Sequence, residues 1–101
     1  MNIAIREHIV HVHIIGVTGR LEAFTVSDFR QQQETLLADG ATQFVVDLSQ
    51  TEFMDSAGMS ALVALLKRAR QADGDVVLVK PTNPAAYRIL TLTRFDQVFR
   101  M

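Results

Sequence analysis

A serine and an aspartate at the expected start of a helix are the residues best placed to do chemistry. Asp55 and Ser56 follow a short apolar run and a polar loop, and an apolar stripe with helical spacing comes after them. A serine at this point lies beside backbone N–H groups that have no partner within the helix. Those donors favour an added phosphate, whereas the neighbouring carboxylate repels one. The residues therefore allow either a phosphorylation site at Ser56 or a plain cap formed by Asp55 or Ser56.

A serine nucleophile is a second interpretation of the same junction. The nucleophile elbow of a hydrolase needs small residues two positions before and two positions after the serine. Gly58 meets this requirement and Met54 does not. The general base would have to be one of three histidines in a single early segment, and nothing in the sequence places that segment beside Ser56. The pattern does not favour a serine hydrolase.

The three histidines could instead bind a metal ion; they are His8, His11 and His13. On a strand, His11 and His13 share one face, whereas His8 has the opposite parity. Two imidazoles make an incomplete site, and the chain has no cysteine to complete it. The chain also has no glycine-rich loop of the kind that holds phosphates. We therefore expect no metal and no other cofactor.

Composition limits the remaining classes. The chain has 101 residues, of which 49% are hydrophobic and 21% charged, so a single domain over residues 1–101 is expected. No apolar run approaches the roughly 20 residues that cross a bilayer, so we expect no membrane insertion. A net charge of −1 argues against nucleic acid as a partner. The absence of cysteine is compatible with a cytoplasmic protein.

The elements that must position Ser56 can be predicted from hydrophobic spacing. An opening hairpin is expected from strands at 3–6 and 9–17, and further strands are expected at 44–48, 76–79 and 95–99. Helices are expected from residue 26 to the glycine at 40, from the start of the apolar stripe to the glycine at 74, and from the proline at 84. Thr25 suits the first helix as its capping residue, with Asp28 as the acidic partner of a capping box. The segments 18–22 and 49–55 are expected to be loops.

This order of elements, β-β-α-β-α-β-α-β, predicts an α/β fold. Strands that alternate with helices after a hairpin form a mixed sheet, with right-handed crossovers and helices packed against it. We expect about three helices.

The chain resembles the STAS domain family, in particular the anti-sigma-factor antagonists of bacterial partner-switching systems. The resemblance covers nearly the whole chain. The segments that carry it are Gly19-Arg20-Leu21-Glu22 with Thr25, Val46-Asp47-Leu48 followed by Phe53-Met54-Asp55-Ser56-Ala57-Gly58-Met59, Asn83-Pro84-Ala85, and Phe95 with Val98-Phe99. The central segment is the most specific of these.

The resemblance implies a non-enzymatic regulator of transcription in the bacterial cytoplasm. In this family an ATP-binding anti-sigma factor, which is also a serine kinase, phosphorylates the serine that follows the aspartate. The unmodified antagonist binds that kinase and frees the sigma factor, and a phosphatase of the PP2C type resets the cycle. Carried over to this chain, Ser56 is the phosphoacceptor. The resemblance places the partner-binding surface at Glu22, Thr25, Asp55, Ser56, Ala57 and Gly58.

The chain departs from the family pattern in four places. Ala57 replaces a serine or threonine, Met59 replaces a leucine and Glu22 replaces an aspartate. The sequence also stops at Met101, where many relatives continue into a last helix. The domain is therefore expected either to lack that helix or to cover the exposed apolar surface with a second copy, as a homodimer. A STAS module of another system, such as a stress-signalling scaffold, a lipid-transport complex or an anion transporter, is the alternative function.

Overall fold

The computed structural model describes residues 1–4 and 11–101. In chain order the elements of this part are β1 (Val12–Gly16), β2 (Gly19–Leu21), α1 (Val26–Ala38), β3 (Gln43–Asp47), β4 (Thr51–Met54), α2 (Ser56–Gln71), β5 (Asp75–Val79), α3 (Pro84–Leu92) and α4 (Phe95–Val98). Helices connect strands that pair in parallel, so the predicted α/β class is confirmed. In the described part, no helix has both the length and the apolar composition needed to span a bilayer.

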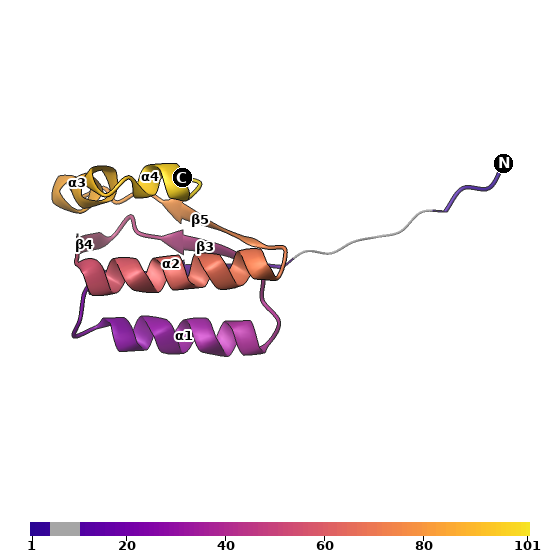
Figure 1. Ribbon diagram of the computed structural model, residues 1–101, viewed down its shortest axis with the longest axis horizontal. Helices are drawn as coiled ribbons and strands as arrows, with labels where there is room; N and C mark the ends of the chain where they lie inside the picture. Colours follow the sequence, from indigo (N-terminus) through magenta and orange to yellow (C-terminus); the bar gives the residue numbers. More distant parts are fainter. Residues whose placement is uncertain (5–10) are drawn as a thin grey trace.

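The strands form two small parallel sheets. One has the order β1-β3-β5, and the other joins β2 to β4. In the larger sheet alternate side chains point to one face, where Phe44, Val46, Val76 and Leu78 are buried. Figure 1 shows α1 and α2 side by side on one side of the strands, with α3 and α4 on the other. The core therefore lies mainly between the larger sheet and the α1–α2 pair.

The second helix follows its predicted course. Its core-facing side chains recur with helical spacing, and the helix ends before Gly74, whose N–H donates to the Ala69 carbonyl at 2.8 Å. Gln33, the polar residue that interrupts the apolar stripe of α1, is 4% exposed, and its side chain donates to the Ala61 carbonyl at 3.1 Å. A buried amide needs such a partner. This bond ties α1 to α2 inside the core.

The start of α3 also follows the prediction. The side chain of Asn83 accepts hydrogen bonds from the N–H groups of Ala85 and Ala86, and Pro84 occupies the first turn, where its missing N–H costs nothing. The first helix differs at its start. Thr25 is at its N-cap position, but the threonine hydroxyl does not cap the helix. The predicted capping box of Thr25 and Asp28 is wrong, because that hydroxyl is taken by the preceding loop.

Two short strands were expected to be loops. Strands β2 and β4 have three and four residues, and within the described residues they pair only with each other. Segments of this length show too few side chains for an alternating pattern to be read from sequence. Near the N-terminus, residues 3 and 4 are not in a strand. The turn of the expected hairpin falls on residues 5–10, which lie outside the described residues. All described pairings are parallel.

The expected last strand, 95–99, is wrong. Residues 95–98 form the short helix α4, which makes four helices in the described part instead of about three. Phe95 and Phe99 are four residues apart, so helical geometry brings their rings within 5.5 Å of each other and buries Phe99. Strand-like pairing is limited to a bridge between Arg100 and Val77.

Gly74 offers a test of this packing. A Cβ at Gly74 would overlap the carbonyl oxygen of Thr42, whereas a Cβ at Gly16 would meet nothing within 4 Å. We expect Gly74→Ala to lower the free energy of unfolding by about 1–3 kcal/mol, because backbone atoms must move apart. Gly16→Ala is the matched control and should leave stability nearly unchanged. Urea unfolding followed by circular dichroism measures both, and equal stabilities would contradict the packing.

Candidate functional site

The carboxylate of Asp55 joins two parts of the chain that lie far apart in the sequence. Asp55 is the N-cap of α2, and its Oδ1 accepts a hydrogen bond from the Gly58 N–H at 3.0 Å. Its Oδ2 accepts a second hydrogen bond, also at 3.0 Å, from the N–H of Ala23 in the loop between β2 and α1. The Asp55 N–H donates to the Leu21 carbonyl at 3.3 Å. One residue therefore fixes that loop to the start of α2.

These hydrogen bonds keep the carboxylate ionised. The N–H of Gly58 has the largest effect and lowers the pKa of Asp55 below its ordinary value of 3.8. Partial burial works in the opposite direction, and the N–H of Ala23 adds to the lowering. Donors that favour the charged form of an acid lower its pKa in this way.

The close approach of α2 to β2 requires a glycine. Gly58 is buried, and a Cβ at this position would overlap the carbonyl oxygen of Leu21. Leu21 itself is fully buried. The predicted site residue Gly58 thus serves to seat the first turn of α2 directly on the backbone of β2.

Ser56 is the first residue of α2, and its side chain is exposed. Asp55 supplies the cap, and no group in the described part of the chain hydrogen-bonds the serine hydroxyl. Of the two interpretations of this junction, the capping role therefore falls to Asp55. The hydroxyl of Ser56 is left accessible at the helix start, beside the half-buried Ala57.

The loop before α1 is held by its own side chains. The hydroxyl of Thr25 accepts from the Glu22 N–H at 3.0 Å and donates to the Arg20 carbonyl at 2.6 Å. Glu22 forms an ion pair with Arg20 at 3.0 Å. The guanidinium of Arg20 also lies over the ring of Phe53, 4.4 Å from its centre. The structure therefore brings Glu22 and Thr25 together with Asp55, and gives Thr25 a structural role in the loop.

Phe24 is a candidate contact residue that the sequence reading missed. It lies in the loop held by Asp55, and it is 91% exposed. A large exposed aromatic side chain on an anchored loop is typical of a contact residue for another protein. The signal in the sequence was a phenylalanine in a polar segment, outside every expected helix and strand.

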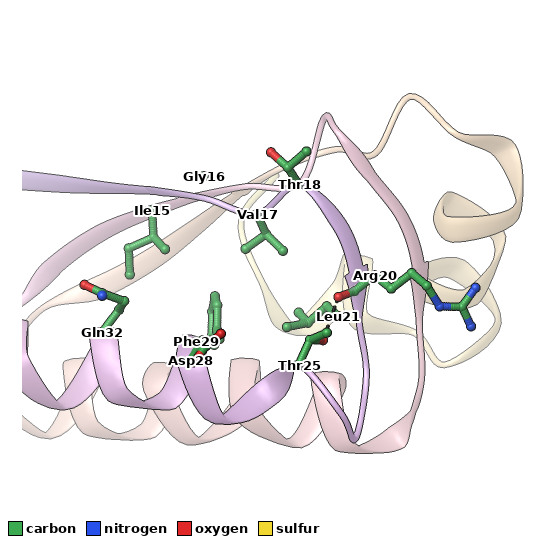
Figure 2. Close-up of a pocket in the computed structure, with 10 residues that line it drawn as sticks. All are labelled: Ile15, Gly16, Val17, Thr18, Arg20, Leu21, Thr25, Asp28, Phe29 and Gln32. Atoms are coloured by element: carbon green, nitrogen blue, oxygen red, sulfur yellow. Dashed lines mark hydrogen bonds between the residues drawn. The ribbon is translucent and has the colours of Figure 1, made fainter.

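A hollow of about 350 Å3 lies behind this loop, between the β1–β2 segment and the first turns of α1 (Figure 2). In Figure 2 the side chain of Arg20 extends away from the hollow, while Asp28, Phe29 and Gln32 line it from α1. Neither Ser56 nor Asp55 lines it. The hydroxyl of Thr25, which lines it, is already bonded to the loop backbone, so we assign no reaction to the hollow.

No hydrogen bond joins His11 or His13 to Ser56 in the described part of the chain. His13 is on β1 with its ring 6.2 Å from that of Phe44, and its Nδ1 is buried without a hydrogen-bond partner. His11 precedes the same strand, and His8 lies outside the described residues. Within residues 1–4 and 11–101, no three potential metal ligands come together. The geometry of the described part therefore gives no support to a hydrolase or a metal site.

The fold and this surface define an α/β domain with an exposed serine at a capped helix start. A family model with the description "Mlab, STAS domain" matches residues 6–100, so the chain belongs to the STAS domain family. A STAS-domain containing protein of Pseudomonas aeruginosa is 28% identical over 87 residues, which are 86% of this chain and 84% of that protein. The anti-sigma-B factor antagonist of Staphylococcus aureus is 28% identical over 65 residues, 64% of this chain and 60% of that protein.

Solved structures support the same family. An anti-sigma factor antagonist from Mycobacterium paratuberculosis has a TM-score of 0.77 and 28% identity, over 92% of this chain and 78% of that one. The unphosphorylated anti-sigma factor antagonist SpoIIAA has a TM-score of 0.71 and 19% identity, over 95% of this chain and 84% of that one, and shows the fold alone. A sulfate transporter family protein from Wolinella succinogenes also shares the fold, with a TM-score of 0.69 and 18% identity over 90% of this chain and 75% of that one. The chain is thus a STAS domain that is similar to anti-sigma factor antagonists.

The hydrogen bonds of Asp55 predict a pH dependence of stability. A carboxyl group with a lowered pKa in the fold stabilises the fold above its unfolded pKa, and this contribution is lost as the pH falls through the folded pKa. We therefore expect wild type to be more stable than Asp55→Asn at neutral pH, with a difference that shrinks below about pH 4. Urea unfolding between about pH 7 and pH 3 measures it.

Asp39→Asn, at an exposed carboxylate after α1, is the matched control for this series. A stability difference between wild type and Asp55→Asn that stays constant over the whole pH range would contradict the role of the ionised carboxylate.

Proposed function

We propose that this chain is an anti-sigma-factor antagonist that is switched by phosphorylation of Ser56. The observation that carries the proposal is the exposed hydroxyl of Ser56 beside a helix cap that Asp55 supplies. Because the cap does not depend on the serine, a phosphate on Ser56 leaves the helix start intact. The similarity to anti-sigma factor antagonists supports the same function.

The effect of the phosphate is electrostatic. It adds a charge of about −1.5 to −2 at neutral pH, next to the ionised Asp55. A partner that covers this surface would have to bury the new charge beside a like charge, which is costly. Release of the partner by a factor of ten needs only about 1.4 kcal/mol. A partly screened repulsion is therefore sufficient for the switch.

The proposed partners follow from this function. An ATP-binding anti-sigma factor, itself a serine kinase, binds the unmodified surface at Ser56 and Ala57 and the anchored loop with Glu22 and Thr25. Gly58 is buried and contributes by seating this helix start on β2. The kinase supplies the catalysis and the chain supplies the acceptor hydroxyl, so the chain acts without an active site or a cofactor of its own. A phosphatase of the PP2C type removes the phosphate. These steps take place in the cytoplasm.

A second candidate is a STAS interaction module of another system, such as a lipid-transport complex, a stress-signalling scaffold or an anion transporter. The family model supports this second candidate, because its description names Mlab and does not name an anti-sigma factor antagonist. The identity of the protein that binds the anchored loop separates the two candidates.

Ser56 should be the residue that the kinase modifies. The purified chain is used to capture partners from a lysate of its own source, and the captured anti-sigma factor is then incubated with the chain and ATP. Mass spectrometry should find one phosphate on Ser56, and Ser56→Ala should remain unlabelled. Ser56→Asp should capture at least about tenfold less of the anti-sigma factor than wild type.

Three outcomes would contradict this prediction. They are a phosphate on another residue, equal labelling of Ser56→Ala, and equal capture by wild type and Ser56→Asp. Capture of transporter subunits in place of an ATP-binding anti-sigma factor would favour the second candidate.

Phe24 should contribute directly to partner binding. Because its side chain is 91% exposed, Phe24→Ser should leave the unfolding midpoint unchanged and weaken binding of the anti-sigma factor by about tenfold or more. Ile14→Ser, at a side chain 72% exposed on β1, is the matched control and should bind like wild type. Isothermal titration calorimetry measures both. Unchanged affinity of Phe24→Ser would remove Phe24 from the contact surface.

A further inference from the structure

A groove of about 550 Å3 starts at Ser56 and runs along α2. Its other wall comes from Phe95 and from Thr93, which lies shortly before α4. The floor is apolar, with Met59, Val63 and Ala64 of α2 facing Phe95. Lys67 lies at the far end. The groove therefore extends away from the proposed phosphorylation site over an apolar surface to a cation.

The groove has the length of three helical turns. Ser56 and Lys67 are 11 residues apart on α2, which corresponds to about 16 Å at 1.5 Å per residue. The lining residues recur every three or four positions, so they form a stripe on one side of the helix. Such a stripe beside a second wall matches the way in which an amphipathic helix lies in an apolar groove.

The cation at the far end has no carboxylate near it in the described part of the chain. Three cationic residues lie close to the end of α2. Arg68 forms an ion pair with Glu34, and Arg70 forms one with Asp75 at 3.2 Å. Lys67 has no carboxylate within 4 Å among the described residues. A bound partner with a carboxylate at this end would give Lys67 an ion pair like those of Arg68 and Arg70.

The rim of the groove favours a helix over a small molecule. Ser56, Ser60 and Lys67 are exposed along its α2 side. A small ligand is normally buried over most of its surface, and a groove with exposed rims leaves much of it in water. A helix needs to bury only its apolar side and keeps its polar side in solvent.

We propose that this groove binds an amphipathic helix of the anti-sigma factor, with apolar side chains on the floor and a carboxylate at Lys67. The inference rests on the proposed function, because the groove begins at the residue that the switch modifies. Lys67 is about 16 Å from Ser56, farther than the screening length of about 8 Å at physiological salt. The lysine therefore does not offset the phosphate charge, and phosphorylation weakens the near end of the helix contact.

Charge substitutions in the groove test this proposal. Ser60→Glu places a negative charge over the apolar floor, and Lys67→Glu reverses the charge at the far end; both residues are exposed, so the fold should be retained. Each variant should weaken binding of the anti-sigma factor by at least about tenfold in isothermal titration calorimetry. Gln31→Glu, at an exposed residue of α1 that does not line the groove, is the matched control and should bind like wild type.

A photoreactive amino acid at position 60 identifies the occupant. We expect a cross-link to a helix of the anti-sigma factor with apolar residues at three- and four-residue spacing and an acidic residue at one end. Replacing that acidic residue by lysine should restore binding to Lys67→Glu. A cross-link to a second copy of this chain, or to another part of the anti-sigma factor, would overturn the proposal.

The two hypotheses fail in different ways. If Ser60→Glu and Lys67→Glu bind like wild type while Ser56→Asp does not bind, the groove proposal is wrong and the proposed function stands. If wild type itself binds no anti-sigma factor, the proposed function is wrong and the groove loses the occupant assigned to it.

Discussion

The ionised carboxylate of Asp55 is the interaction on which the candidate site depends. Its two oxygens accept hydrogen bonds from the backbone of Gly58 and of Ala23, which belong to different elements. A hydrogen bond to a charged acceptor is about twice as strong as one between neutral groups. The start of α2 and the loop before α1 are therefore fixed relative to each other. This pair of bonds holds the loop with Phe24 next to the helix start that carries Ser56.

Two different residues cap α2 and accept the proposed phosphate, although one serine could have done both. Serine is among the favoured capping residues, and modification of a capping serine would change the group that holds the helix start. Here Asp55 provides the cap and Ser56 points outward one residue later. Because α2 packs against β5 and α1, its start must stay in place. The proposed modification can then change what the surface binds while the core stays the same.

The sequence predicted well those features that depend on neighbouring residues. The course of α2 follows from an apolar stripe, and the start of α3 follows from Asn83 and Pro84. Long-range contacts decided the rest. The bond from Ala23 to Asp55 spans 32 residues, and the hydroxyl of Thr25 is taken by its own loop, so neither could be read from local spacing. The short strands β2 and β4 exist because they pair with each other.

The distance over which a charge acts links the two proposed contact surfaces. Screening limits the effect of a surface charge to about 8 Å at physiological salt. A phosphate on Ser56 would therefore act only on contacts near the start of α2. The anchored loop with Phe24 reaches that point through Asp55, and the apolar groove begins at Ser56 itself. Because the two surfaces meet at one residue, a single modification can weaken both, and no movement of the backbone is needed.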